Sequence, residues 1–131
     1  MTTRVHALHA PTSSVLLTHD DAVPRVVHWG RRIDGDALDD ASLATLLDAP
    51  VPHGSLDSVP PVGLLPEHLR GWAAYGGIAG HRADGTAWVP VLARTASYGD
   101  SSSFTWTGTD AIAGLTVTVT VSLDAHGVLA I

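Results

Sequence analysis

The number of histidines is the first feature of the sequence that suggests a chemical role, namely metal binding. The chain has eight histidines and no cysteine, which excludes disulfides and thiolate metal sites. His6 and His9 are three positions apart, and on an extended chain this odd spacing directs them to opposite faces. No HExxH motif or other zinc-ligand spacing occurs. We therefore expect no metal site and no cofactor.

Paired carboxylates are the second chemistry to consider, because they perform the acid–base steps of glycosidic bond hydrolysis. Asp57 and Glu67 stand in one long segment, residues 49–80, which is rich in proline and glycine. No motif beside Asp57 would raise its pKa, and no GxSxG sequence provides a serine nucleophile. We therefore expect two solvated loop carboxylates and no catalytic residue in this chain.

Tryptophan is the third type, with four residues against one phenylalanine and two tyrosines. Flat indole rings suit either the core between β-sheets or a surface that stacks on sugars. Trp29 and Trp88 lie in strand-like runs, which favours core packing for both. Trp72 lies in the glycine-rich part of the long segment, where exposure is expected. The position of Trp106 is compatible with either role.

The elements that position these residues are mainly strands. The clearest is residues 115–123, LTVTVTVSL, in which valines and hydroxyl residues alternate as in a half-buried strand with the valines inward. The sequence DAHG then predicts a turn, and residues 128–131 begin a return strand. Shorter strands are expected at residues 15–18, 24–29 and 86–93, the last interrupted by Pro90.

One helix is expected after the capping residues Asp39 and Asp40. Its apolar face would be formed by Leu43, Leu46 and Leu47, and it would end before Pro50.

The return strand at the C-terminus is short beside the strand that it follows. We interpret this as a cut in a longer chain, the alternative being a last strand that is simply short.

Length and charge narrow the class of protein. A chain of 131 residues predicts one domain, residues 1–131. The net charge is −6 and the seven cations are scattered arginines, which argues against a nucleic-acid partner. No signal peptide and no run of 18 apolar residues is visible, so we expect no membrane partner and, by default, a cytoplasmic location.

Five sequence blocks occur in an order that resembles the N-terminal domain of family 36 glycoside hydrolases, the bacterial α-galactosidases. The blocks are VPRVVHWGRRI (23–33), PHGSLD (52–57), LLPEH (64–68), GIAGHRADGTAWVP (77–90) and DAIAGLTVTVTVSLDAHGVLAI (110–131). The resemblance implies an all-β fold, an antiparallel β-supersandwich with one short helix. It also implies that a catalytic (β/α)8 barrel follows. That barrel needs about 250 residues, so this chain would be a non-catalytic accessory domain.

The parent enzyme implied by the resemblance is a retaining hydrolase of terminal α-galactosides. Its partners would be the α-galactoside and the barrel of the same chain. A homo-oligomer is also implied, because in tetrameric members a loop of this domain reaches a neighbouring active site. That loop corresponds to PHGSLD, and the resemblance also retains Arg82, for which we expect an ion pair within the domain.

The contact surface that we expect consists of His53, Ser55, Asp57 and Trp72, facing substrate or a neighbouring subunit. The alternative for Asp57 is a side chain that caps its own turn. The alternative for the whole chain is a free-standing β-sandwich module for carbohydrate binding or protein interaction. In that case Trp72 or Trp106 would be the aromatic platform.

Overall fold

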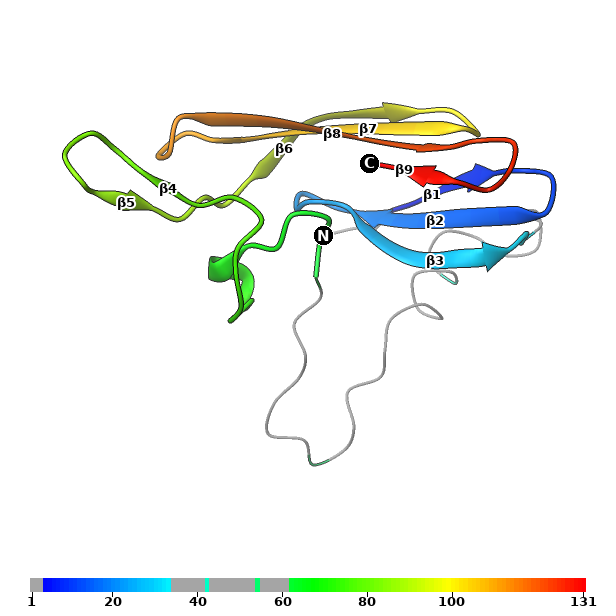
Figure 1. Ribbon diagram of the computed structural model, residues 1–131, viewed down its shortest axis with the longest axis horizontal. Helices are drawn as coiled ribbons and strands as arrows, with labels where there is room; N and C mark the ends of the chain where they lie inside the picture. The colour runs from blue at the N-terminus through cyan, green and yellow to red at the C-terminus, as the bar shows by residue number, and fades with distance from the viewer. Residues whose placement is uncertain (1–3, 34–41, 43–53, 55–61) are drawn as a thin grey trace.

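The computed structural model describes residues 4–33, 42, 54 and 62–131. Within these ranges the chain forms antiparallel β-sheets, which confirms the all-β prediction (Figure 1). The residues expected to form a helix, Asp39 to Leu47, lie outside the described residues except for Ser42.

The first sheet is a meander with the order β1-β2-β3. Its strands are β1 (Arg4–His9), β2 (Ser13–His19) and β3 (Arg25–Arg31). The predicted strands at residues 15–18 and 24–29 are confirmed as parts of β2 and β3, whereas β1 was not predicted. The central strand β2 is buried along almost its whole length.

The second large sheet has the order β6-β7-β8-β9. Its strands are β6 (Ala93–Gly99), β7 (Ser103–Asp110), β8 (Leu115–Leu123) and β9 (Leu129–Ala130). β8 has the bounds and the faces that its alternation predicts, since Val119 and Val121 are buried and Thr116, Thr118 and Thr120 are exposed. The DAHG turn is confirmed, with Gly127 N–H bonded to Asp124 O at 3.0 Å.

A short hairpin, β4 (Gly80–His81) and β5 (Ala87–Trp88), stands apart from both large sheets (Figure 1). The prediction of one strand over residues 86–93 is wrong, because pairing stops at Trp88 and resumes at Ala93. Pro90 has no N–H to donate to a sheet. The next two N–H groups donate to side chains instead: Val91 to Asp110 Oδ2 at 2.7 Å and Leu92 to Glu67 Oε1 at 2.6 Å.

The two large sheets face each other across one apolar core (Figure 1). Both sheets contribute side chains to this core, which is made of Leu8, Ala10, Val15, Leu17, Val23, Leu92, Phe104, Trp106, Val119, Val121 and Leu123. The core is therefore formed by segments from the beginning and the end of the described chain.

The tryptophans are distributed differently from the prediction. Trp106 is fully buried in the core, which excludes it as an exposed platform. Trp29 was expected in the core but is 59% exposed; it lies on β3, which among the described strands pairs with β2 alone. Trp88 is half-buried and lies outside the core, with its ring against Gly80 of the paired strand.

Candidate functional site

A cavity of about 420 Å³ lies where the β2–β3 turn meets the segment 62–72. Its volume falls within the range of small-molecule sites in proteins, which is about 300–1,000 Å³. The side chains that matter for its chemistry are those of Thr18, Asp20, Arg25, Glu67, Arg70 and Trp72. We treat this cavity as the candidate site because it includes Trp72, the described member of the expected contact surface.

The wall formed by the segment 62–72 is held in place by hydrogen bonds at both ends. Leu64 donates its N–H to Pro24 O at 2.8 Å, which attaches the segment beside the β2–β3 turn. At the other end a single turn of 3-10 helix, η2 (His68–Arg70), ends at Gly71 with a φ of 96°. That positive φ favours glycine and turns the chain toward Trp72.

Glu67 is buried, so the expectation of a solvated loop carboxylate is wrong for this residue. Its Oε1 accepts a hydrogen bond from the N–H of Leu92, and its Oε2 accepts one from the Nε–H group of Arg70 at 2.6 Å. Arg70 also donates to Leu92 O at 3.3 Å. Because both carboxylate oxygens are occupied, Glu67 braces the cavity wall and is not positioned as an acid or base.

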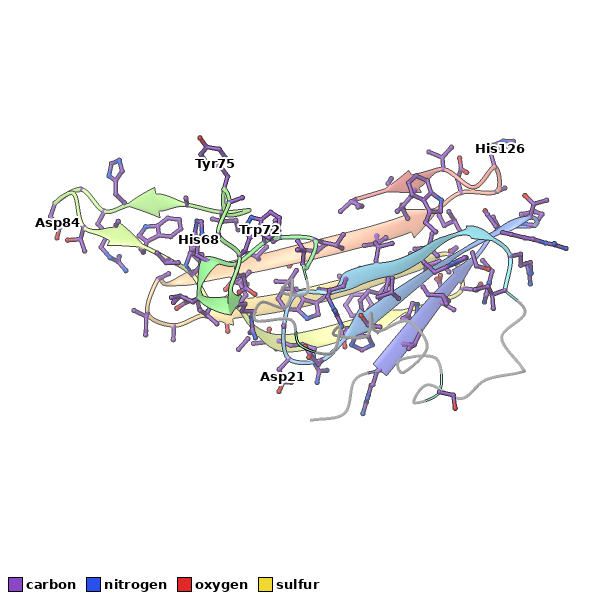
Figure 2. The ribbon with its side chains drawn as sticks, turned by 90° about the horizontal axis from the view of Figure 1, so that it is seen from below. Asp21, His68, Trp72, Tyr75, Asp84 and His126 are labelled. Atoms are coloured by element: carbon purple, nitrogen blue, oxygen red, sulfur yellow. The ribbon has the colours of Figure 1, made fainter. Side chains whose placement is uncertain are left out.

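Trp72 is half-buried and lines the cavity. Its indole N–H donates to Tyr75 O at 2.8 Å, and its own carbonyl oxygen lies 3.0 Å from His68 Nδ1. Figure 2 shows His68 and Trp72 together on this segment, with Tyr75 projecting away from the sheets. Since the N–H is already used, Trp72 can offer a ligand the apolar surface of its ring.

The polar groups around the cavity balance one another in charge. Asp20 and Glu67 provide two carboxylates, and Arg25 and Arg70 provide two guanidinium groups. Thr18 also lines this cavity, although its hydroxyl oxygen is itself buried, without a hydrogen-bond partner in the described part of the chain. Charge-balanced polar side chains in a cavity that also includes an aromatic ring suit a neutral ligand that carries hydroxyl groups.

The other expected contact residues, His53, Ser55 and Asp57, lie outside the described residues. Their role stays a prediction, as does the alternative in which Asp57 caps its own turn. Thr18, Asp20, Arg25 and Arg70 were not predicted as a site. They come from two segments far apart in the sequence, and no local pattern connects them.

Arg82 has a structural role, but not through the expected ion pair. Its guanidinium donates to Ile112 O at 2.9 Å and to Ala113 O at 3.4 Å, which ties the β4–β5 hairpin to the β7–β8 turn.

His6 and His9 point to separate partners, Asp100 O at 2.9 Å and Ser14 Oγ at 2.8 Å. In the described part of the chain, no three His, Asp or Glu residues are grouped closely enough to hold a metal ion.

Comparison with known proteins gives no relative for this chain. No protein-family model, no curated protein and no solved structure matches it. Within the described ranges no helix combines the length and the apolar character needed to cross a membrane.

Proposed function

We propose that this chain is a non-catalytic accessory β-domain that contacts carbohydrate, as the N-terminal domain of an α-galactosidase would. The observation that carries the proposal is the cavity beside Trp72. The half-buried indole ring lines this cavity together with charge-balanced polar side chains. The resemblance of the five sequence blocks supports the α-galactoside as the substrate class of the parent enzyme, and a cytoplasmic location belongs to the same proposal.

The chemistry of the cavity fits a pyranose. An apolar face of a sugar ring can lie against Trp72, while a hydroxyl group at its edge reaches the carboxylate of Asp20. Asp20 uses its Oδ1 to accept the N–H of Ala22 at 2.6 Å, and Oδ2 is the oxygen left for a ligand. Balanced charge favours a neutral sugar over a phosphate or a polycation.

The test is a titration of the isotopically labelled chain with methyl α-galactoside, followed by NMR. We expect saturable shifts of the amides around the cavity, with Thr18, Arg25 and Trp72 among them. Trp72→Ala should weaken this binding about tenfold, the change expected when about 1.4 kcal/mol of apolar contact with the ring is lost. Trp29→Ala is the matched control, because Trp29 is exposed but is not part of the cavity lining.

Two results would contradict the carbohydrate proposal. One is the absence of saturable shifts with any methyl glycoside. The other is equal loss of affinity in Trp72→Ala and Trp29→Ala. A preference for methyl α-galactoside over methyl α-glucoside would support the α-galactosidase assignment, whereas equal binding would leave a general carbohydrate site.

The second candidate is a free-standing module for carbohydrate binding, which the same cavity favours. The coding sequence downstream of the Ile131 codon distinguishes the two. A reading frame that continues into a (β/α)8 barrel supports the accessory domain, and a stop codon supports the free-standing module.

A further inference from the structure

His19 is the residue at which the cavity meets the apolar core. It is the last residue of β2, it lines the cavity, and only 8% of its surface is exposed. On the core side the centre of its ring lies 4.9 Å from that of Phe104, which belongs to β7 in the second large sheet. The ring of His6 on β1 lies 4.7 Å from the same phenylalanine. A change at His19 can therefore reach both the cavity and the contact between the sheets.

The surroundings of His19 favour one form of its ring. Nδ1 is buried, and it has no hydrogen-bond partner among the residues that the structure describes. A protonated imidazole carries an N–H group on both nitrogens, and the one at Nδ1 would stay unpaired here, which is costly for a buried donor. The neutral tautomer with its hydrogen on Nε2 avoids this cost. The site therefore accommodates the neutral ring and disfavours the imidazolium.

The charged groups that face His19 act in the same direction. Arg94 on β6 and His6 and Arg4 on β1 are the cationic groups around it, and Asp20 is the carboxylate that opposes them. Burial first, and then the three cationic groups, hold the pKa of His19 below its ordinary value of 6.5. At neutral pH the cavity wall is thus uncharged at this position, and acid adds a positive charge to it.

Arg94 connects this charge to the turn that lines the cavity. Its backbone N–H donates to Asp21 O at 2.9 Å, and its guanidinium donates to Asp21 Oδ1 at 3.5 Å. Asp21 is labelled in Figure 2, and its neighbours Asp20 and Ala22 belong to the cavity lining. A proton on His19 would repel Arg94, which holds this β2–β3 turn against β6. Protonation is therefore felt by the wall of the cavity as well as by the ring itself.

We propose that His19 is a pH-dependent switch of the cavity, which takes up its ligand while the imidazole is neutral and releases it when the imidazole is protonated. The choice of a neutral sugar as that ligand rests on the proposed function. A sugar displaces water from the cavity wall, and a charged imidazole needs that water. The other charged residues of the lining already balance one another, and a proton on His19 leaves one positive charge in excess; they are Asp20 and Glu67 against Arg25 and Arg70.

The affinity for methyl α-galactoside as a function of pH is the first measurement. Affinity should be constant above pH 6.5, and it should be about tenfold weaker at about one pH unit below the pKa that His19 has in the folded chain. His19→Gln should give a flat pH profile, whatever its affinity at neutral pH. His126→Gln, on the exposed turn after β8, is the matched control and should keep the pH dependence.

The second measurement follows the carbon-bound hydrogens of the His19 ring by NMR while the pH is lowered. Without sugar, the amides of Ala22, Val23 and Trp72 should shift with the same midpoint as His19, and in His19→Gln they should not. Binding and protonation are reciprocally coupled, so methyl α-galactoside should move the His19 midpoint to lower pH. The dispersion of the remaining amide signals shows that the chain is still folded at each pH.

The two measurements distinguish failure of the switch from failure of the carbohydrate proposal. If no glycoside binds but the cavity amides titrate with His19, the carbohydrate proposal fails and the switch is supported. If the sugar binds equally well on both sides of the His19 midpoint, or leaves that midpoint unchanged, the switch is overturned and the carbohydrate site is not. Cavity amides that ignore the protonation of His19 would also overturn the switch. Should His19→Gln fail to fold, the midpoint in the unmodified chain, with and without sugar, still decides.

Discussion

At the scale of single residues, the ring of Trp106 packs so closely against its own strand that the residue beneath the ring must be a glycine. The indole ring lies fully buried across Gly108, two positions further along the same face of β7. A Cβ atom at position 108 would overlap the ring. The small residue therefore makes room for the largest side chain of the core, which explains a glycine inside a strand that would otherwise weaken it.

His19 is a buried titratable residue in the same core region. It is 8% exposed, and its ring lies 4.9 Å from that of Phe104. Burial lowers its pKa below the ordinary value of 6.5, and the nearby positive charges of Arg94, His6 and Arg4 lower it further, while Asp20 opposes the shift. The folded protein thus favours the neutral imidazole.

This shift predicts a dependence of stability on pH. The unfolded chain binds a proton at His19 below pH 6.5 and the folded chain does so only at lower pH. The free energy of unfolding should therefore fall as the pH decreases from about 6.5 through the folded-state pKa. His19→Gln should flatten this part of a urea-unfolding series, and His126→Gln, on an exposed turn, should not. An unchanged slope in His19→Gln would contradict the assignment.

At the scale of elements, alternation was the most informative signal in the sequence. β8 was predicted with correct bounds and faces because each second residue is apolar, with valines at the three central positions. β6 and β7 were not predicted, although their turn carries a recognisable signal. Asp100 Oδ1 accepts the N–H groups of Ser102 and Ser103 at 2.7 and 2.9 Å, which is the turn chemistry that was recognised at Asp124.

The same substitution should destabilise the protein much more on the buried face of β8 than on its exposed face. Val121 is fully buried, so Val121→Asp places an unpaired charge in the core and removes about 1.5–3 kcal/mol of apolar burial. A loss of this size is a large fraction of the free energy of unfolding of a marginally stable domain. Thr118→Asp, on the exposed face, loses a threonine hydroxyl contact and strand propensity and should lower the free energy of unfolding by only about 1 kcal/mol.

Urea unfolding checks this comparison. Equal midpoints for Val121→Asp and the unmodified chain, or a larger loss in Thr118→Asp, would mean that the faces of β8 are assigned incorrectly.

At the scale of the whole molecule, sequence reasoning could predict the fold class but not the candidate site. Strand periodicity is local, so β2, β3 and β8 could be recognised in advance. The cavity depends on contacts between the β2–β3 turn and the segment 62–72, which no local pattern encodes. Trp72 was singled out because exposure was expected in its glycine-rich segment, whereas Thr18 and Arg25 look like ordinary strand residues.

Glu67 connects these distant parts, because its carboxylate bonds Leu92, 25 positions away, at the start of the second large sheet. Glu67→Ala would leave the Leu92 N–H buried and unpaired, which costs about 1–3 kcal/mol, and would also release Arg70. We expect a lower free energy of unfolding and faster hydrogen exchange at the Leu92 amide. Glu67→Gln keeps an oxygen that can accept the Leu92 N–H. It should therefore lower the free energy of unfolding less, and accelerate exchange at Leu92 less, than Glu67→Ala. If exchange at Leu92 is the same in Glu67→Ala and the unmodified chain, Glu67 does not join the cavity wall to the second sheet.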